Sequence, residues 1–351
     1  MSKFSKILMV DDSLVFRTIL KNCIRQLDIA EQAFTAVNGR SALDIFENHP
    51  DIDLIICDLE MPVMDGVTFV KKLREINKET PVLILSNQSI GGVNLTFKAL
   101  EIGANEFISK TDASITDPEE QEKELKLKLS NFFKPLLRNQ KDNSQKKEVV
   151  KGSINPQFGK KKKYDLICIG SSTGGPEALK NVVSKLDSKI NIPIIIVQHM
   201  PAVFTTVLAS NLNKVCPLEV CEAKNGQVLE KGHVYIAPGD HHLTVSFKDN
   251  KYVFSLNQNE KVCYVRPSVN VTIESLLHYY SDNMALFILT GMGDDGKDGC
   301  IKAKEKGSTV LIQDEASSVV WGMPGAVYKN ECYDEVLDLD NIGYTINKIA
   351  G

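Results

Sequence analysis

The sequence has no apolar run that could cross a bilayer, no CxxC cysteine pair and no excess of basic residues. Its longest apolar stretches, such as residues 192–197, have the length of a strand, whereas a membrane helix needs ~20 apolar residues. The eight cysteines are scattered, which favours reduced thiols over a disulfide or zinc framework. Acidic residues at positions 11 and 12 interrupt the first apolar stretch too early for a signal peptide. These absences predict a cytoplasmic protein that does not span a membrane.

The charge and length of the chain constrain its partners and its domain count. With 41 basic residues against 45 acidic ones, the chain is not expected to bind nucleic acid. A length of 351 residues suggests two domains, at about 150 residues per domain. Residues 138–163 hold nine basic and two acidic residues with almost no apolar periodicity, which predicts a flexible basic linker. We therefore expect domains at 1–137 and 164–351.

Both halves alternate short apolar runs with amphipathic stretches, the pattern of an α/β protein with doubly wound, mainly parallel sheets. Ser13 is expected to cap the first helix. A hairpin is expected around Asp249 and Asn250. The predicted strands are 6–10, 33–37, 54–57, 82–85 and 106–108 in the first half, and 165–169, 193–197, 219–222, 285–289 and 309–312 in the second.

Acidic and basic side chains follow the strands of the first half. Asp11 and Asp12 follow the first strand, Asp58 the third, Ser86 the fourth and Lys110 the fifth. Because functional groups gather at the carboxyl ends of parallel strands, we expect these side chains to converge. Converging carboxylates suit Mg²⁺, and a carboxylate can also attack phosphorus to give an acyl phosphate. Single acids at such positions also serve as helix caps, so the argument depends on the whole set.

This constellation resembles the response-regulator receiver domain, a flavodoxin-like fold, over roughly residues 5–128. The resemblance implies phosphorylation by a sensor histidine kinase, with Mg²⁺ as cofactor. One departure is Thr111, where the family usually has proline. The implied roles are Asp58, in CDLEMP at 57–62, as phosphoacceptor; Asp11 and Asp12, with Asp58, as Mg²⁺ ligands; Ser86 and Phe107 as the switch hydroxyl and aromatic; and Lys110 as phosphoryl contact.

A serine, a histidine and an aspartate follow three predicted strands of the second half. Residues 170–174 fit GxSxG, a sharp strand-to-helix turn that presents a serine, here Ser172. His199 ends the next strand, and Asp294 and Asp295 follow the strand at 285–289. The set predicts a nucleophile, a general base and an orienting acid, although spacing alone does not choose between the two aspartates. Glycines around Met292 would leave backbone amides free to bind an oxyanion.

Two other interpretations of these residues stay open from spacing alone. A glycine- and serine-rich turn also cradles phosphates, although neither GxGxxG nor GxxxxGK[ST] is present. The second half could accordingly be a nucleotide- or partner-binding module without catalysis. The aspartate pair could also bind a metal, but no further ligands with suitable spacing follow it.

Longer motifs in the second half resemble the chemotaxis protein-glutamate methylesterase family, over roughly residues 164–351. They are IGSSTGG at 169–175, QHMP at 198–201, YIAPGDHH at 235–242, RPSV at 266–269 and LTGMGDDG at 289–296. The resemblance implies a triad of Ser172, His199 and Asp295, with the Met292 amide as oxyanion donor and no cofactor for hydrolysis.

The family acts on glutamate γ-methyl esters of chemoreceptors and deamidates some of their glutamines, which implies methylated receptors as substrate. A receiver domain placed over the catalytic cleft, released by phosphorylation of Asp58, is the expected regulation. Three positions depart from the family pattern: Ser171 replaces a common alanine, Asp294 a common asparagine and Asn270 a usual aspartate. We expect Ser172, and not Ser171, to be the nucleophile.

Overall fold

The structure is a computed structural model that describes residues 3–110, 117–142, 150–152 and 162–350. The chain divides into two compact units, Met1–Lys147 and Glu148–Gly351. The boundary between them falls inside the predicted linker. No helix among the described residues has both the length and the apolar character needed to cross a membrane.

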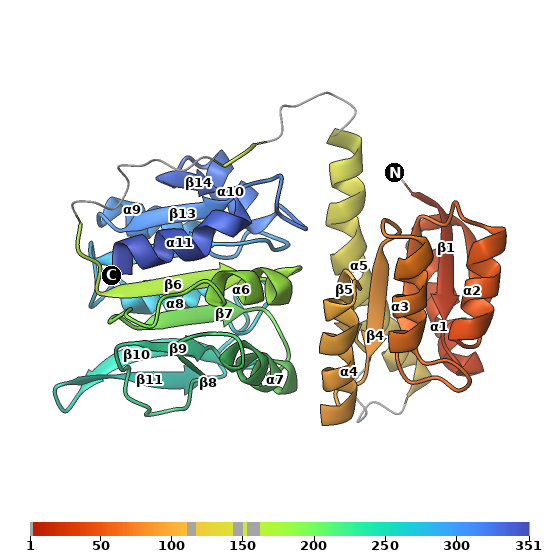
Figure 1. The fold of residues 1–351 in the computed structure, drawn as a ribbon, viewed down its shortest axis with the longest axis horizontal. Coiled ribbons are helices and arrows are strands. Elements are labelled where there is room, and N and C mark those ends of the chain that lie inside the picture. Colours follow the sequence, from red (N-terminus) through yellow and green to blue (C-terminus); the bar gives the residue numbers. More distant parts are fainter. Residues whose placement is uncertain (1–2, 111–116, 143–149, 153–161, 351) are drawn as a thin grey trace. The chain divides into compact units, whose positions relative to one another are not determined.

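The first unit is a five-stranded parallel sheet in the order β2-β1-β3-β4-β5, covered by helices on both faces (Figure 1). Helices α1 and α5 pack on one face, and α2, α3 and α4 on the other. Strands β3 and β4 are buried at every residue, so the sheet is the centre of two apolar cores. The elements are β1 Phe4–Val10, α1 Leu14–Gln26, β2 Ala30–Ala36, α2 Gly39–Asn48, β3 Leu54–Asp58, α3 Gly66–Ile76, β4 Val82–Ser86, α4 Ile90–Glu101, β5 Glu106–Ser109 and α5 Pro118–Asp142.

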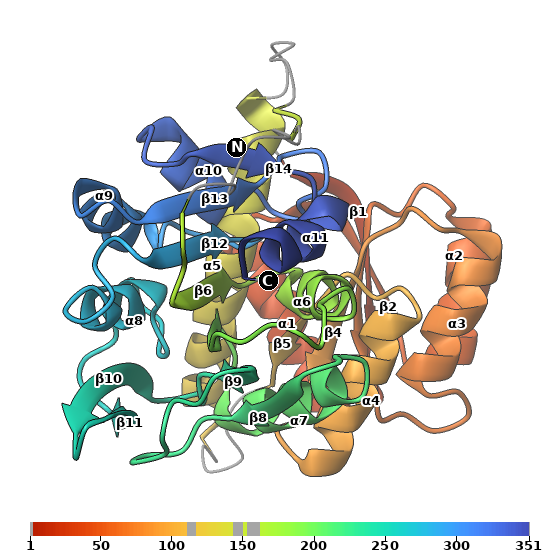
Figure 2. The same cartoon turned by 60° about the vertical axis from the view of Figure 1, so that its left-hand side comes forward.

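The second unit is a seven-stranded parallel sheet in the order β14-β13-β12-β6-β7-β9-β8. A separate antiparallel hairpin, β10 and β11, packs against α8 (Figure 2). The elements are β6 Leu166–Ser171, α6 Gly175–Val183, β7 Ile194–Gln198, α7 Ala202–Asn213, β8 Glu219–Glu222, β9 His233–Ile236, β10 His242–Lys248, β11 Lys251–Asn257, α8 Val269–Leu276, β12 Met284–Ile288, α9 Lys297–Glu305, β13 Thr309–Gln313, α10 Met323–Lys329, β14 Glu335–Leu337 and α11 Leu339–Ala350.

The order of the strands places β6 at a topological switch point. The chain runs from β6 outward to β7, β8 and β9, and then crosses back to β12 on the other side of β6. Ligand sites of open parallel sheets form at the carboxyl ends of the strands where the order reverses. The residues that follow β12, β6 and β7 therefore meet at one edge of this sheet.

The predicted fold class is confirmed, and every predicted strand is present with ends shifted by at most a few residues. The predicted hairpin is confirmed, with Asp249 and Asn250 as its turn. Ser13 caps α1, because its side chain accepts a hydrogen bond from the Phe16 amide. Two strands were not predicted, β9 and β14, whose four and three residues are too short to give a clear alternation.

The segment expected as a linker, 138–163, has structure in its described parts. Helix α5 extends to Asp142, into the first residues of that segment. Farther along, the Gly152 amide donates to the Asp314 carboxylate (2.9 Å), and the Glu315 amide donates to the Val150 carbonyl (3.0 Å). The second unit therefore fixes a short piece of the segment on its own surface.

Candidate functional site

Asp11, Asp58 and Lys110 form a buried ionic cluster at the carboxyl edge of the first sheet. β1 pairs with β3 in parallel, so Asp11 and Asp58 lie at neighbouring strand ends. The Lys110 Nζ contacts Asp11 Oδ2 at 2.9 Å and Asp58 Oδ2 at 2.8 Å. Burial raises the pKa of Asp58 above its ordinary value, against the opposing effect of Lys110. Burial alone would lower the pKa of Lys110, but the Asp58 and Asp11 charges outweigh it and raise that pKa.

Asp12 completes a set of three carboxylates that fits a divalent cation. Oxygen atoms of Asp11, Asp12 and Asp58 all lie within 4.8 Å of one another, and the Asp12 side chain is exposed. The amides of Ser13 and Leu59 each donate to one of these carboxylates (2.8 Å), which fixes their orientation. Hard cations such as Mg²⁺ prefer carboxylate oxygens, so these residues suit the predicted cofactor.

Ser86 lies at the end of β4, beside Asp58, but its hydroxyl bonds to α4. The Thr96 hydroxyl contacts the Ser86 Oγ, and the carbonyl oxygens of Asn87 and Gly92 lie 3.1 and 3.4 Å from it. Phe107, on β5, is half-buried against the core on the α2–α4 face. The structure thus gathers the aspartates and Lys110, and the Ser86 hydroxyl is engaged by Thr96, Asn87 and Gly92. Thr111 lies outside the described residues.

In the second unit, Ser172 and His199 follow two paired strands in the same register. Ser171 on β6 is the partner of Gln198 on β7, so the next residue of each strand also lies side by side. The Ser172 amide donates to the Thr290 carbonyl (3.0 Å), which attaches the serine turn to the loop after β12. The strand order therefore brings the predicted serine, histidine and acidic loop together.

The two adjacent serines have different surroundings. Ser171 is fully buried, and its hydroxyl donates to the Gln198 Oε1 (2.6 Å). Gln198 in turn donates from Nε2 to the carbonyls of Ser172 (2.9 Å) and His199 (3.2 Å). Ser172 is half-buried at the apex of the turn. A buried hydroxyl already engaged by Gln198 is poorly placed to attack a substrate, whereas Ser172 is partly exposed.

Asp295 is buried and holds His199 through a short hydrogen bond. The His199 Nε2 lies 2.8 Å from Asp295 Oδ2, and since a carboxylate can only accept, Nε2 carries the hydrogen and Nδ1 is left as a base. Three further donors reach the carboxylate from the start of α8: the Ser268 hydroxyl (2.8 Å) and the amides of Val269 (2.6 Å) and Asn270 (3.1 Å).

These donors set the charge state of Asp295. Burial acts to raise its pKa, but the hydrogen bond and charge of His199, with the donors from Val269 and Ser268, outweigh burial and lower it. Asp294 is exposed and contacts the Lys297 Nζ at 3.3 Å. The structure thus brings Asp295, and not Asp294, to the histidine.

The loop after β12 supplies backbone amides beside Ser172. Among the described residues, no acceptor lies within hydrogen-bonding distance of the Met292 or Gly293 amide. Gly293 has a φ of +86°, a conformation that favours glycine. At Gly291, an added Cβ would lie 2.8 Å from the Ser172 Cβ, so only glycine allows this close approach. The loop can therefore present free donors at the serine.

Comparison with known proteins decides between the interpretations. A family model described as CheB methylesterase matches residues 167–346, and one described as response regulator receiver domain matches residues 7–116. The chain belongs to the CheB methylesterase family. A "protein-glutamate methylesterase/protein-glutamine glutaminase" of Trichodesmium erythraeum is 36% identical over 100% of both chains, and one of Sulfurimonas denitrificans is 37% identical over 97% of both.

Solved structures agree with this assignment. The crystal structure of the Thermotoga maritima CheB methylesterase catalytic domain is 39% identical, with a TM-score of 0.52, and covers 53% of this chain and 98% of that one. This CheB-family chain is thus a hydrolase that carries a response regulator receiver domain. A second half without catalysis, the other interpretation of the sequence, is wrong.

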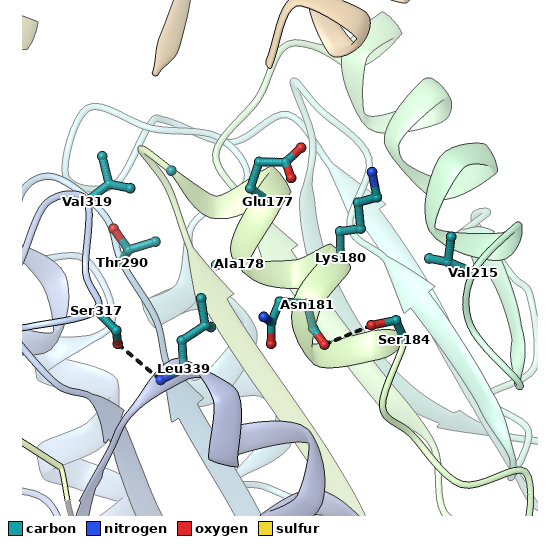
Figure 3. A pocket seen from close by; sticks show the side chains of 11 residues that line it. Glu177, Ala178, Lys180, Asn181, Ser184, Val215, Thr290, Ser317, Val319 and Leu339 are labelled. Atoms are coloured by element: carbon teal, nitrogen blue, oxygen red, sulfur yellow. Dashed lines mark hydrogen bonds between the residues drawn. The ribbon is translucent and has the colours of Figure 1, made fainter. Parts of the chain in front are cut away.

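An open cleft of about 460 Å³ lies beside α6 in this methylesterase, and one of its lining residues is Gly174, at the start of α6. Thr290 and Val319 face it from the loops after β12 and β13 (Figure 3). Figure 3 shows Glu177, Asn181 and Ser184 along the length of α6 beside the cleft. The cleft runs along α6, and Ser172, His199 and Asp295 do not line it.

Two supporting residues of the methylesterase site were not predicted to have roles. Ser268 holds Asp295, and Gln198 holds the turn of Ser172. Both lie inside motifs that carry the family resemblance, RPSV and QHMP, and this was the one available signal. Their partners are distant in sequence or on the next strand, so spacing alone could not reveal the contacts.

Proposed function

We propose that this chain hydrolyses glutamate γ-methyl esters on methyl-accepting chemoreceptors, deamidates some of their glutamines, and is regulated by phosphorylation at Asp58. The observation that carries the proposal is the hydrogen bond between His199 and the buried Asp295, at the strand ends where Ser172 also lies. The names of the relatives from Trichodesmium erythraeum and Sulfurimonas denitrificans support both reactions.

The triad would act through the two nitrogens of His199. The Ser172 oxygen attacks the γ-carbonyl carbon while its proton passes to the His199 Nδ1, the nitrogen left free by the bond from Nε2 to Asp295. The proton then goes to the departing methoxide, and methanol leaves. Water, deprotonated by the same histidine, hydrolyses the acyl-serine and restores the enzyme. A glutamine follows the same path with ammonia as the leaving group.

The Met292 amide is the proposed donor to the oxyanion. Negative charge develops on the carbonyl oxygen in each tetrahedral state, and a preorganised amide stabilises that charge more than it stabilises the ester. A donor of this kind typically lowers the barrier by about 3–4 kcal/mol. The Met292 amide has no acceptor among the described residues, which leaves it available for this contact.

The receiver domain, proposed at 1–137, would accept a phosphoryl group from a chemotaxis sensor histidine kinase. The Asp58 carboxylate attacks phosphorus, and Lys110 contacts the phosphoryl oxygens. Asp11, Asp12 and Asp58 would hold Mg²⁺, which when bound neutralises charge on the transferred group. Ser86 and Phe107 would respond to the new charge. A linker at 138–163 then joins the receiver to the cytoplasmic methylesterase domain at 164–351.

Methanol release from methylated chemoreceptors tests this function. The wild-type chain is expected to release methanol, and to release it faster with a small phosphodonor and Mg²⁺. Ser172→Ala should abolish release, whereas Ser171→Ala, its matched neighbour, should retain most of it because the Ser171 hydroxyl only bonds to Gln198. Release that survives Ser172→Ala but not Ser171→Ala would refute the assignment of the nucleophile.

A further inference from the structure

Residues 262–265, between β11 and α8, form a tight turn with an unusual backbone. The Val265 amide donates to the Val262 carbonyl (3.0 Å), and φ is +51° at Cys263 and +65° at Tyr264. Two successive positive φ angles are the pattern of a type I′ turn, which favours asparagine and glycine. For cysteine and tyrosine this conformation brings Cβ too close to the backbone, so both residues are strained.

A second turn in the same unit shows the ordinary solution to this problem. The hairpin of β10 and β11 also turns through two residues with positive φ, Asp249 at +48° and Asn250 at +60°. Aspartate and asparagine tolerate the left-handed region because of their short polar side chains. The chain therefore uses tolerant residues at the hairpin turn and intolerant ones at 262–265.

Nothing in the fold of this unit offsets the strain at Tyr264. Its exposed fraction is 92%, the highest of the large hydrophobic residues that the structure describes. It has no hydrogen bond or ring contact among the described residues. A tyrosine that gains no packing and costs backbone strain is better explained by contact with another molecule than by stability.

The turn is rigidly attached to the catalytic edge. The Asn270 Nδ2 donates to the Cys263 Sγ (3.8 Å), and the backbone amide of the same Asn270 donates to Asp295. On the other side, Arg266 donates to the carbonyls of Gln258 (2.7 Å) and Asn259 (2.9 Å). The turn that carries Tyr264 is thus connected to the triad aspartate through Cys263 and Asn270.

We propose that Tyr264 is a docking residue that contacts the protein segment carrying the methyl ester. This inference rests on the proposed function. An exposed tyrosine offers a large ring and one hydroxyl and has only two side-chain torsions to order, which suits a folded protein surface. Tyr264 is not part of the triad and is connected to it only through Cys263 and Asn270, so we expect it to affect a protein substrate more than a small ester.

The test compares two substrates, methylated chemoreceptor in membranes and a small N-acetylated glutamate γ-methyl ester amide. Tyr264→Gly is expected to lower kcat/KM on the receptor about tenfold more than on the small ester, chiefly through KM. Because glycine relieves the strain, the same change should raise the midpoint of thermal unfolding by about 1–2 °C. Tyr264→Phe, which keeps the ring, should retain the receptor rate within about twofold.

Asn250→Gly is the matched control, because it changes the equivalent position of the hairpin turn. Strand β10 has seven residues, so this turn lies about 20 Å from the base of the hairpin. It should alter neither substrate's kcat/KM. An equal loss on both substrates with Tyr264→Gly, or no loss on the receptor, would overturn the docking role. A wild-type chain that releases no methanol from receptors would instead refute the proposed function.

Discussion

Replacement of Asp295 by asparagine should damage both the fold and the chemistry of the catalytic unit. The two carboxylate oxygens each accept two hydrogen bonds: Oδ1 from Ser268 and the Asn270 amide, and Oδ2 from His199 and the Val269 amide. An asparagine has only one acceptor oxygen, and its NH₂ group must replace the other. In either orientation, one backbone amide at the start of α8 then faces a donor.

The size of the effect follows from these contacts. A buried amide that loses its acceptor costs about 1–3 kcal/mol, and a lost negative charge at a helix N-terminus costs about 0.3–2 kcal/mol. Together they predict that Asp295→Asn lowers the free energy of unfolding by about 1–5 kcal/mol. If the NH₂ group faces His199, the imidazole is forced into the tautomer with hydrogen on Nδ1, and kcat should fall by about 10⁴.

The stability that the Asp295 carboxylate contributes should depend on pH. The pKa of Asp295 is lowered in the folded chain, so its stabilising contribution is complete above the ordinary carboxyl value of about 4. That contribution is lost as the pH falls through the lowered, folded-state pKa. The stability gap between wild type and Asp295→Asn should therefore be full at pH 7 and should narrow below about pH 4.

Urea unfolding at pH 7 and methanol release measure the two effects. Asp294→Asn is the matched control, since Asp294 is exposed and has one contact with Lys297; its loss should change stability by less than about 0.5 kcal/mol. If Asp295→Asn unfolds within about 0.5 kcal/mol of wild type, the claim that the carboxylate supports α8 is refuted. Retention of a tenth or more of the activity would refute the change of His199 tautomer in this variant.

Three further predictions concern the receiver domain. Asp58→Asn should accept no phosphate from acetyl phosphate with Mg²⁺, measured by mass spectrometry; labelling at the parental rate would contradict the assignment. Lys110→Ala leaves Asp11 and Asp58 buried without their cation and should destabilise the receiver by about 3 kcal/mol, measured by thermal unfolding. Added Mg²⁺ should recover part of that loss. Removal of residues 1–150 should speed methanol release, and no increase over the unphosphorylated chain would argue against inhibition by the receiver.

The fold class was predictable because buried parallel strands are continuous apolar runs. β3 and β7 are buried at every residue, and short runs of this kind bounded by turn residues indicate strands. The order of the strands was not predictable from the runs themselves. That β12 pairs with β6, across more than a hundred residues of sequence, is a property of long-range packing and not of local pattern.

The reactive residues of the candidate site were predictable from the sequence, but the residues that hold them in place by hydrogen bonds were not. Ser172, His199 and the aspartate pair follow strands, so their convergence could be expected from topology. The choice between Asp294 and Asp295 depends on the start of α8, whose donors come from a distant motif. The bond between the Ser86 hydroxyl and Thr96 of α4 likewise has no signal in the strand pattern.

The carboxylate of Asp295 accepts hydrogen bonds from the first amides of α8, and this affects which substitutions would indicate that a family member is inactive. Selection for a folded protein alone would keep an aspartate here, because the start of α8 needs its charge and its oxygens. By contrast, the one hydrogen bond that the side chains of Ser172 and His199 make among the described residues is the bond to Asp295. In a family member that has lost catalysis, we therefore expect substitutions at the positions of Ser172 and His199. The position of Asp295 should remain an aspartate, because its carboxylate accepts hydrogen bonds from the start of α8.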